Sequence, residues 1–228
     1  MLTIRRADER GLTDIDWLHS RHTFSFGDYI DPAHHHYRSL RVINDDVIAG
    51  GGGFPLHPHR DMEILTYVMR GQLQHRDSMG NGTVIGPGEW QKMSAGTGIR
   101  HSEFNPSETE TVHLLQIWIH PDRKNITPEY DQKLFTEEDK RNRWCLIASP
   151  DGRDGSIRLH QDAVLSAAIL DGAALTYALG EGRGAWLHVA MGTVTINGRE
   201  LREGDAAAVE GEAIVVSGTG EVLLFDLR

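Results

Sequence analysis

Cysteine is almost absent from this sequence, since Cys145 is the only one among 228 residues. A single cysteine cannot form a disulfide within the chain, which excludes a disulfide-stapled fold and fits a reducing compartment. Long apolar runs are also lacking: no segment approaches the roughly 18 consecutive apolar residues of a membrane span. The first residues, MLTIRRADE, contain no apolar core of a secretion signal. We therefore expect a soluble, cytoplasmic protein.

Positive charge is scarce relative to negative charge, with 23 Lys and Arg against 33 Asp and Glu and a net charge of −10. Such a chain repels phosphate backbones, so we expect no nucleic-acid partner. Because no apolar run is long enough to span a membrane, we expect no membrane partner either. Glycine, by contrast, is frequent, with 25 residues that recur between short apolar runs. A chain of this length can form one large or two small domains with real cores, as a monomer or a weak dimer.

Short β-branched or alternating segments separated by turn signals dominate the first half of the chain. The segments 40–44, 64–69, 72–75 and 113–119 are predicted strands, and the polar run 44–46 is interpreted as a turn that ends the first of them. Strands of this length at regular spacing predict a barrel or a sandwich.

The second half of the chain repeats the first in outline. Segment 67–73 corresponds to segment 188–194, and segment 114–118 corresponds to segment 222–226. The central glycines of the first pair coincide, as expected where each hairpin needs a residue that tolerates positive φ. The order of the matches predicts two related β-barrels in one chain.

A charged segment without alternation separates the two copies. Within it Thr136 precedes three acidic residues and is predicted to be the N-cap of a short helix. We therefore predict an all-β fold of two tandem antiparallel β-barrels of the jelly-roll type, joined by a short helical linker. The predicted domains are 1–135 and 136–228.

Two short motifs place ligand-type side chains two residues apart. They are His57-Pro58-His59 and His101-Ser102-Glu103. Side chains alternate faces along a strand, so each motif points both of its polar side chains the same way. Three imidazoles and one carboxylate that converge on one spot form a first-row transition-metal site. The predicted metal ligands are thus His57, His59, His101 and Glu103.

These residues also resemble a known superfamily, the cupins. The pattern G-x5-H-x-H-x3-E at 51–63 resembles the first cupin motif, although its closing glycine, Gly71, comes one position late. The pattern G-x2-H-x3-N at 98–105 resembles the end of the second motif, with Gly96 where a proline is expected.

The local sequence is closer to one cupin branch, the pirins. HPHRDME at 57–63 and MSAGTGIRHSE at 93–103 look like the two signatures of that family. W-x4-HTFSF at 17–26 and RVINDD at 41–46 also resemble pirin segments. The resemblance is strong over 17–120 and weaker toward the C-terminus.

The resemblance implies a bicupin with one mononuclear, iron-type site in the N-terminal barrel and a degenerate C-terminal barrel without metal ligands. The family's ligands map onto the four residues named above. Bacterial pirins are similar to quercetin 2,3-dioxygenases, which open the flavonol ring with O₂ and release carbon monoxide. The implied partners are therefore a small aromatic substrate and O₂. Fe(II) is favoured, while Mn, Co, Ni, Cu and Zn stay open because ligand type does not separate them.

Two carboxylates compete for the ligand position. Glu103 lies about 6.6 Å along a strand from His101, whereas Glu63 lies about 13 Å beyond His59 and would need a bend or a bulge to reach the ion. Many cupins nevertheless use the carboxylate at the position of Glu63. We assign Glu103 as ligand and as the catalytic general base toward a substrate hydroxyl, and we expect Glu63 to face inward behind the ligands.

Other functions stay open at this point. Animal pirins are described as nuclear cofactors of transcription regulators, so the alternative is a metal- or redox-sensing regulatory protein that binds a partner protein without catalysis. A non-redox cupin enzyme would use the same ligands, because fold alone does not choose the reaction.

Several histidines outside the motifs have two interpretations. The run 34–36 is a solvated loop or a second metal trap. His22, with Phe24 and Phe26, belongs to a buried strand face or to a pocket wall. His113 lies near the site if it faces inward and is otherwise a hydrogen-bonded strand residue.

Overall fold

A computed structural model describes all residues from 1 to 228, and the chain divides into two compact units. The N-terminal unit comprises residues 11–36 and 40–134, and the C-terminal unit comprises residues 1–10, 37–39 and 135–228. The predicted first domain, 1–135, differs at its start, because β1 (Leu2–Arg5) pairs with β18 (Ala206–Glu210). That pairing joins segments some 200 residues apart, and nothing in the local sequence predicts it.

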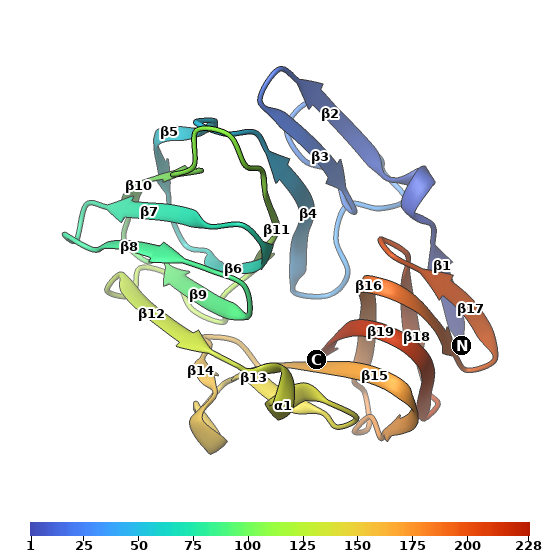
Figure 1. The fold of residues 1–228 in the computed structure, drawn as a ribbon. Helices are drawn as coiled ribbons and strands as arrows, with labels where there is room; N and C mark the ends of the chain where they lie inside the picture. Colours follow the sequence, from blue (N-terminus) through green and yellow to red (C-terminus); the bar gives the residue numbers. More distant parts are fainter. The chain divides into compact units, whose positions relative to one another are not determined.

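The N-terminal unit is built from two antiparallel sheets (Figure 1). One sheet has seven strands in the order β12-β9-β6-β11-β4-β3-β2, and the other has four in the order β5-β10-β7-β8. Its strands are β2 (Gly11–Ile15), β3 (Leu18–His22), β4 (Leu40–Ile48), β5 (Gly53–His59), β6 (Glu63–Arg70), β7 (Leu73–Asp77), β8 (Gly82–Ile85), β9 (Glu89–Ser94), β10 (Ile99–Phe104), β11 (Val112–Ile119) and β12 (Glu129–Leu134).

The two sheets of the N-terminal unit pack face to face. Leu73 and Ile85 of the four-stranded sheet belong to one buried cluster with Val68 and Leu114 of the seven-stranded sheet. Beside this apolar cluster, the same face of the seven-stranded sheet carries a polar row. Strand register aligns Thr66 with Gln116, and Gln116 with Asn44. The space between the sheets is therefore apolar at one end and polar at the other.

The C-terminal unit forms one eight-stranded sheet in the order β1-β18-β16-β19-β15-β13-β14, with β17 paired to β16. Its core is aliphatic and includes Leu187, Val189 and Leu224. Beyond β1 and β18, its elements are η1 (Ala7–Glu9), α1 (Glu137–Lys140), β13 (Cys145–Ser149), η2 (Arg153–Gly155), β14 (Ile157–Arg158), β15 (Ala163–Tyr177), β16 (Gly184–Ile196), β17 (Arg199–Arg202) and β19 (Ile214–Leu227).

The repeat predicted between the two halves is visible in matched positions. Gly71 and Gly192 both adopt positive φ, 75° and 82°. A Cβ at either glycine would lie 2.4–2.5 Å from a backbone carbonyl oxygen, so only glycine fits.

The predicted cap is also confirmed, because the side chain of Thr136 accepts a hydrogen bond from the Asp139 amide at the start of α1. No helix is long and apolar enough to cross a membrane.

The predicted turn at 44–46 is wrong, because β4 continues through these residues to Ile48. Polar composition suggested a turn, but both inward-facing polar side chains have partners on β3. Nδ1 of His22 lies 2.8 Å from Oδ1 of Asn44, and the Ser20 hydroxyl hydrogen-bonds to Asp46. Tertiary contacts thus override the local turn preference.

Candidate metal site

The two ligand motifs lie on neighbouring strands. β5 ends with His57 and His59, β10 carries His101 and Glu103, and the antiparallel register places His101 directly opposite His57. The imidazole centroids of His57 and His101 are 4.4 Å apart, and the centroid of His59 lies 4.8 Å from each of the other two. Strand alternation and this register together bring the three predicted imidazoles into one cluster.

An irregularity in β5 accompanies this arrangement. The register between β5 and β10 shifts between His101, which faces His57, and Glu103, which faces Phe54. Between these two pairs β5 has one residue more than β10, and Pro55 lies in this bulge. Proline has no amide proton, but no inter-strand hydrogen bond is lost at a bulge. The Pro55 carbonyl oxygen lies 2.8 Å from Nδ1 of His57, so the ring donates from Nδ1 and keeps a lone pair on Nε2.

Burial keeps two of the imidazoles neutral. Desolvation, assisted by the neighbouring imidazoles, lowers the pKa of His59 to about 4 and that of His101 to about 3. Neutral imidazole is the form that binds a metal ion. Nε2 of His101 is buried and has no hydrogen-bond partner in the protein, and the ligand atoms of His57, His59 and His101 all lie within 4.8 Å of one another. The donor set therefore fits a first-row divalent ion.

A hydrogen-bonded group lies behind His101. Nδ1 of His75 lies 3.4 Å from Nδ1 of His101 and 3.1 Å from the Gln91 amide nitrogen, and Nε2 of His75 lies 3.1 Å from the Asp77 carboxylate. With the Asp77 carboxylate accepting from Nε2 of His75, Nδ1 of His75 has one lone pair, which faces the Gln91 amide and, at the longer distance, Nδ1 of His101. An N–H group on Nδ1 of His101 is compatible with this arrangement and leaves Nε2 of His101 as an electron-pair donor.

Glu103 is the carboxylate that faces the space between the two sheets. It is 3% exposed, and the amide of Gln116 lies 3.2 and 3.1 Å from its two oxygens. The Thr66 hydroxyl lies 3.4 Å from Oε1 of Glu103 and 3.2 Å from Oε1 of Gln116. Glu103 is not a member of the group formed by His57, His59 and His101, and its ligand atom instead belongs to a second closely spaced group, with those of His75 and His101.

The expectation that Glu63 faces inward is wrong. Ile64 lines the cavity between the sheets, and Glu63, one residue earlier on β6, points to the opposite face. There its carboxylate lies 3.7 Å from the ammonium group of Lys92, which also contacts Glu129. Glu63 belongs to neither group of closely spaced ligand atoms.

A cavity of about 220 Å³ opens at the three imidazoles. Trp118, Phe26 and Phe54 form aromatic parts of its wall, and Trp118 lies edge-on to His59 with ring centroids 5.0 Å apart. The wall also contains a polar strip from β3 and β4, whose members are Ser20, His22, Asn44 and Asp46. The cavity therefore combines ligand nitrogens, flat apolar surface and hydrogen-bonding groups.

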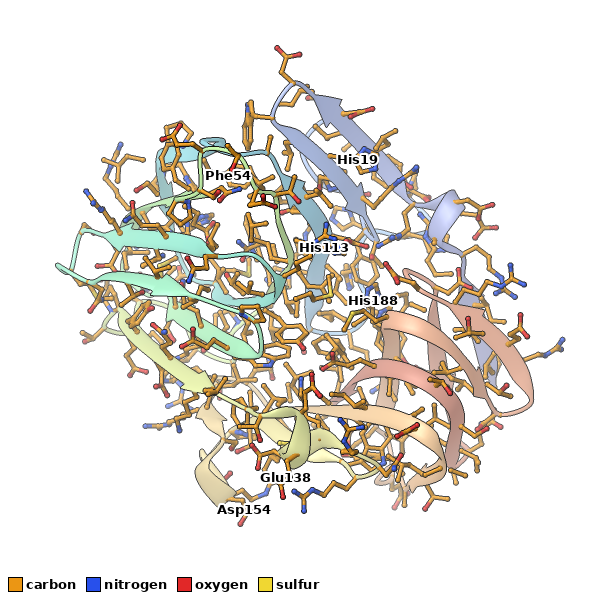
Figure 2. The ribbon with its side chains drawn as sticks, viewed as in Figure 1. His19, Phe54, His113, Glu138, Asp154 and His188 are labelled. Carbon is orange, nitrogen blue, oxygen red and sulfur yellow. The ribbon has the colours of Figure 1, made fainter.

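The structure distinguishes between the two interpretations of each remaining histidine. His22 and Phe26 line the cavity, whereas Phe24 is buried without lining it. His113 lies beside β4 on the other face of the sheet, where its Nε2 is 2.7 Å from Oδ1 of Asp45 (Figure 2). In the run 34–36, Nδ1 of His34 lies 2.8 Å from the Asp31 carboxylate, and neither group of closely spaced ligand atoms includes the run.

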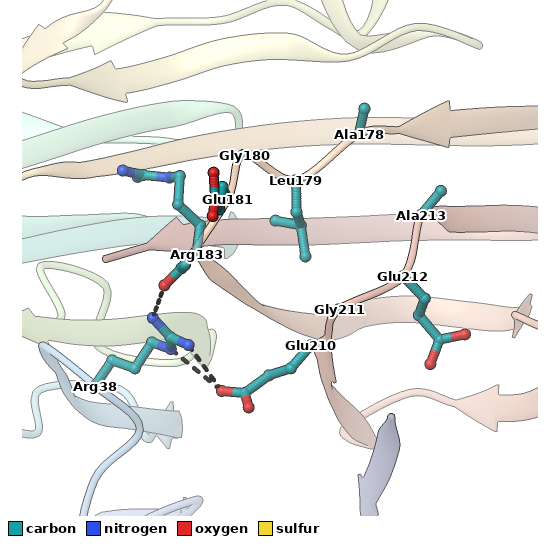
Figure 3. A pocket seen from close by; sticks show the side chains of 11 residues that line it. Arg38, Ala178, Leu179, Gly180, Glu181, Arg183, Glu210, Gly211, Glu212 and Ala213 are labelled. Atoms are coloured by element: carbon teal, nitrogen blue, oxygen red, sulfur yellow. Dashed lines mark hydrogen bonds and ion pairs between the residues drawn. The ribbon is translucent and has the colours of Figure 1, made fainter.

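A larger hollow, of about 630 Å³, lies in the C-terminal unit between residues 178–183 and 210–213 (Figure 3). Two of its charged groups bind each other, because the Arg38 guanidinium donates to the Glu210 carboxylate at 3.0 Å, and Arg38 also donates to the Gly182 carbonyl at 2.8 Å. No imidazole lines this hollow, so the smaller cavity is the candidate for metal binding.

The sequence analysis missed His75, Gln116 and Asp46. His75 could have been predicted, because His75-Arg76-Asp77 also places two ligand-type side chains at i and i+2. Gln116 carried no such signal, since a single amide in an apolar strand has no distinctive spacing. Asp46 was assigned to a turn, which hid its place on the inner face of β4.

Comparison with known proteins identifies both halves of the chain. Residues 4–119 match the Pirin family model, and residues 146–227 match the model of the quercetinase C-terminal cupin domain. These matches confirm the bicupin fold. A structure of the Escherichia coli bacterial pirin YhhW in complex with nickel(II) is 48% identical, with a TM-score of 0.95 over 100% of this chain and 99% of that one.

Curated relatives agree with the family models. A protein of E. coli K12 named quercetin 2,3-dioxygenase is 49% identical over 100% of this chain and 99% of its own length. A pirin-like protein of Caulobacter vibrioides is 41% identical, over 94% and 93%. A quercetin 2,3-dioxygenase structure from Acinetobacter baumannii, at 20% identity and a TM-score of 0.76, shares the fold. With both cupin halves matched and its imidazoles clustered in the first, this chain belongs to the pirin family.

Proposed function

We propose that this protein is a metal-dependent dioxygenase that acts on quercetin-like flavonols. The observation that carries the proposal is a cluster of three imidazoles, two of them kept neutral by burial, that line a cavity with aromatic walls. The names of the full-length relatives support the same reaction. Both atoms of O₂ would enter the ring-opened product, and one ring carbon would leave as carbon monoxide.

The ion would be held by His57, His59, His101 and Glu103, and Fe(II) is the native ion that we propose. When bound, the ion supplies Lewis acidity and a template for substrate and O₂. The Pro55 carbonyl accepts from Nδ1 of His57, and Nδ1 of His75 faces Nδ1 of His101, so these contacts favour the ligating tautomers of both rings before the ion arrives.

Glu103 is the proposed general base. Its carboxylate accepts the proton of the reacting hydroxyl, which makes the flavonol more electron-rich and more reactive toward O₂. Gln116 and Thr66 hold the carboxylate in place within the buried space.

The walls of the cavity would position the substrate. Trp118 and Phe26 meet edge to face, with ring centroids 5.4 Å apart and an interplanar angle of 78°. Such surfaces accept a flat aromatic molecule and exclude water from the reacting atoms.

The test is oxygen uptake by metal-stripped protein reloaded with Fe(II), in the presence of quercetin. Saturable uptake with carbon monoxide release, lost in His101→Ala, would establish the dioxygenase. Saturable turnover without oxygen consumption would point to a non-redox cupin enzyme. No turnover with Fe(II), Mn(II), Co(II) or Ni(II) would overturn the proposal and favour a sensor, whose affinity for a protein partner changes with the oxidation state of the ion.

We also propose a cytoplasmic location and a monomer or weak dimer. We further propose that the Cys145 thiol takes no part in redox chemistry, because burial raises its pKa and disfavours the reactive thiolate. Size-exclusion chromatography with light scattering would test the oligomeric state.

A further inference from the structure

Asp46 is a buried carboxyl group that the proposed reaction does not use. It lies on β4, and it shares a face with Asn44, which contacts His22, and with Ile48, which belongs to the core between the sheets. Only 2% of the residue is exposed, and it lines the cavity that also contains His57, His101 and Glu103. Asp46 therefore faces the same space as the proposed metal ligands, from the facing sheet.

One oxygen of Asp46 has no partner in the protein. The Ser20 hydroxyl hydrogen-bonds to the carboxylate, whereas Oδ1 is buried and makes no hydrogen bond. Buried side-chain oxygens in native proteins nearly always have a partner, and exceptions occur where a ligand supplies one. Asp46 is one of the residues that line a cavity of about 220 Å³, so a molecule bound in that cavity is in position to supply the missing donor.

The surroundings specify what kind of donor fits. No Lys or Arg lines the cavity, and its other groups near Asp46 are neutral or acidic. Burial, together with the nearby carboxylates of Asp45 and Glu103, raises the pKa of Asp46 to about 7. A neutral O–H donor on an aromatic ring satisfies such an oxygen without introducing another charge, and the apolar wall accommodates the ring.

We propose that Asp46 is a specificity-determining residue that accepts a hydrogen bond through Oδ1 from a substrate hydroxyl other than the reacting one. The substrate class is then an aromatic molecule with at least two hydroxyl groups, one at the metal ligands on β5 and β10 and one at β4. This inference rests on the proposed function, because it assigns the second contact of the same substrate.

The chain offers a matched control one residue away. Asp45 belongs to the same strand and has the same side chain, but it points to the opposite face and pairs with His113. Asp45→Asn and Asp46→Asn thus make the same chemical change on the two faces of β4. Asn keeps the shape of Asp and removes the charge, so both variants are expected to fold.

The experiment measures binding and turnover of two flavonols by Fe(II)-loaded protein. Quercetin carries additional hydroxyls, and 3-hydroxyflavone carries only the reacting one. Dissociation constants come from quenching of tryptophan fluorescence, since Trp118 lines the cavity. Because the amide oxygen of Asn is a weaker acceptor than a carboxylate oxygen, we expect Asp46→Asn to weaken quercetin binding and raise its KM about 10-fold, with a change below 2-fold for 3-hydroxyflavone. Asp45→Asn should change neither, and kcat and iron content should stay within 2-fold in both variants.

Equal losses for both flavonols, or a loss of iron in Asp46→Asn, would overturn the role of Asp46 and leave the dioxygenase intact. A fall in kcat without a change in KM would also overturn it, because that result assigns Asp46 to the chemical step. Wild-type protein that binds neither flavonol would overturn the proposed function and this inference together. Wild-type protein that prefers 3-hydroxyflavone would overturn the inference alone.

Discussion

The two cupin halves carry the same strand pair with opposite chemistry. In the N-terminal unit Thr66 on β6 lies opposite Gln116 on β11, and in the C-terminal unit Leu187 on β16 lies opposite Leu224 on β19. The repeat in the sequence places these pairs at equivalent positions. The first pair holds the Glu103 carboxylate, and the second belongs to an aliphatic core.

The difference shows which half carries the site. Polar side chains are costly to bury, and the fold does not require them, because the second half fills the same positions with leucine. The first half keeps an amide, a hydroxyl and a carboxylate inside because they hold one another and the proposed metal site. Such departures from an apolar core are expected at functional sites.

The largest expected effect follows from neutralising the Glu103 carboxylate, a partner that the leucine pair of the second half lacks. We expect Glu103→Gln to retain the ion through the three imidazoles and to lower kcat about 10²- to 10⁴-fold, because the amide cannot accept the substrate proton. Steady-state turnover of quercetin at saturating Fe(II), with iron content measured on the same sample, checks this. Activity within 3-fold of wild type would remove Glu103 from the base role.

Exchanging the residue types of Gln116 and Leu224 between the two halves should change the free energy of unfolding by different amounts. Leu224→Gln would bury an amide without a partner in the aliphatic core, so we expect the free energy of unfolding to fall by about 3 kcal/mol. Gln116→Leu at the equivalent position, combined with Glu103→Leu, should cost less than about 1 kcal/mol in metal-free protein, because both partners of the buried hydrogen bonds become apolar. Urea denaturation of both variants measures the two values, and equal losses would contradict the equivalence.

These contrasts show what could be predicted from the sequence. The two ligand pairs were predictable because the i and i+2 spacing needs only strand alternation. The register that brings His101 opposite His57 depends on pairing across some forty residues and on the irregularity at Pro55, which local patterns do not encode. The face of Glu63 was misassigned, since a continuous apolar run gives no alternation to follow. Residues 44–46 were misassigned for the opposite reason, because polar side chains that bind one another inside a sheet resemble a turn.

The first half also contains a polar group that contacts His101, and its central residue is His75. We expect His75→Ala to weaken metal binding about 10- to 100-fold, because His101 loses the partner that fixes its tautomer and orientation. His75→Gln, which keeps a polar side chain of similar length, should recover part of the affinity. Competition with a calibrated chelator measures both constants. An unchanged affinity in His75→Ala would show that His75 only fills space.

Asp46 gives the smallest expected effect, and it depends on pH. Burial raises the pKa of Asp46 from 3.8 to about 7. Between these two pH values the folded protein therefore keeps a proton that the unfolded chain has released. The stability that this group contributes is full below pH 4 and is lost as the pH rises through 7. Asp46→Asn should therefore stabilise metal-free protein by on the order of 2 kcal/mol at pH 8 and by little at pH 4. Urea unfolding at both pH values, with Asp45→Asn as control, tests this, and equal shifts at both pH values would contradict the assignment.

The most direct test of the metal site is calorimetric titration of metal-stripped protein with Ni(II), the ion found in the related E. coli structure. The expected result is one ion per chain, an affinity at least 100-fold lower in His101→Ala, and no change in His113→Ala, whose side chain lies on the other face of β11. Equal affinity in wild type and His101→Ala would show that the ion binds elsewhere and would contradict the account of the first cupin as the metal-binding half.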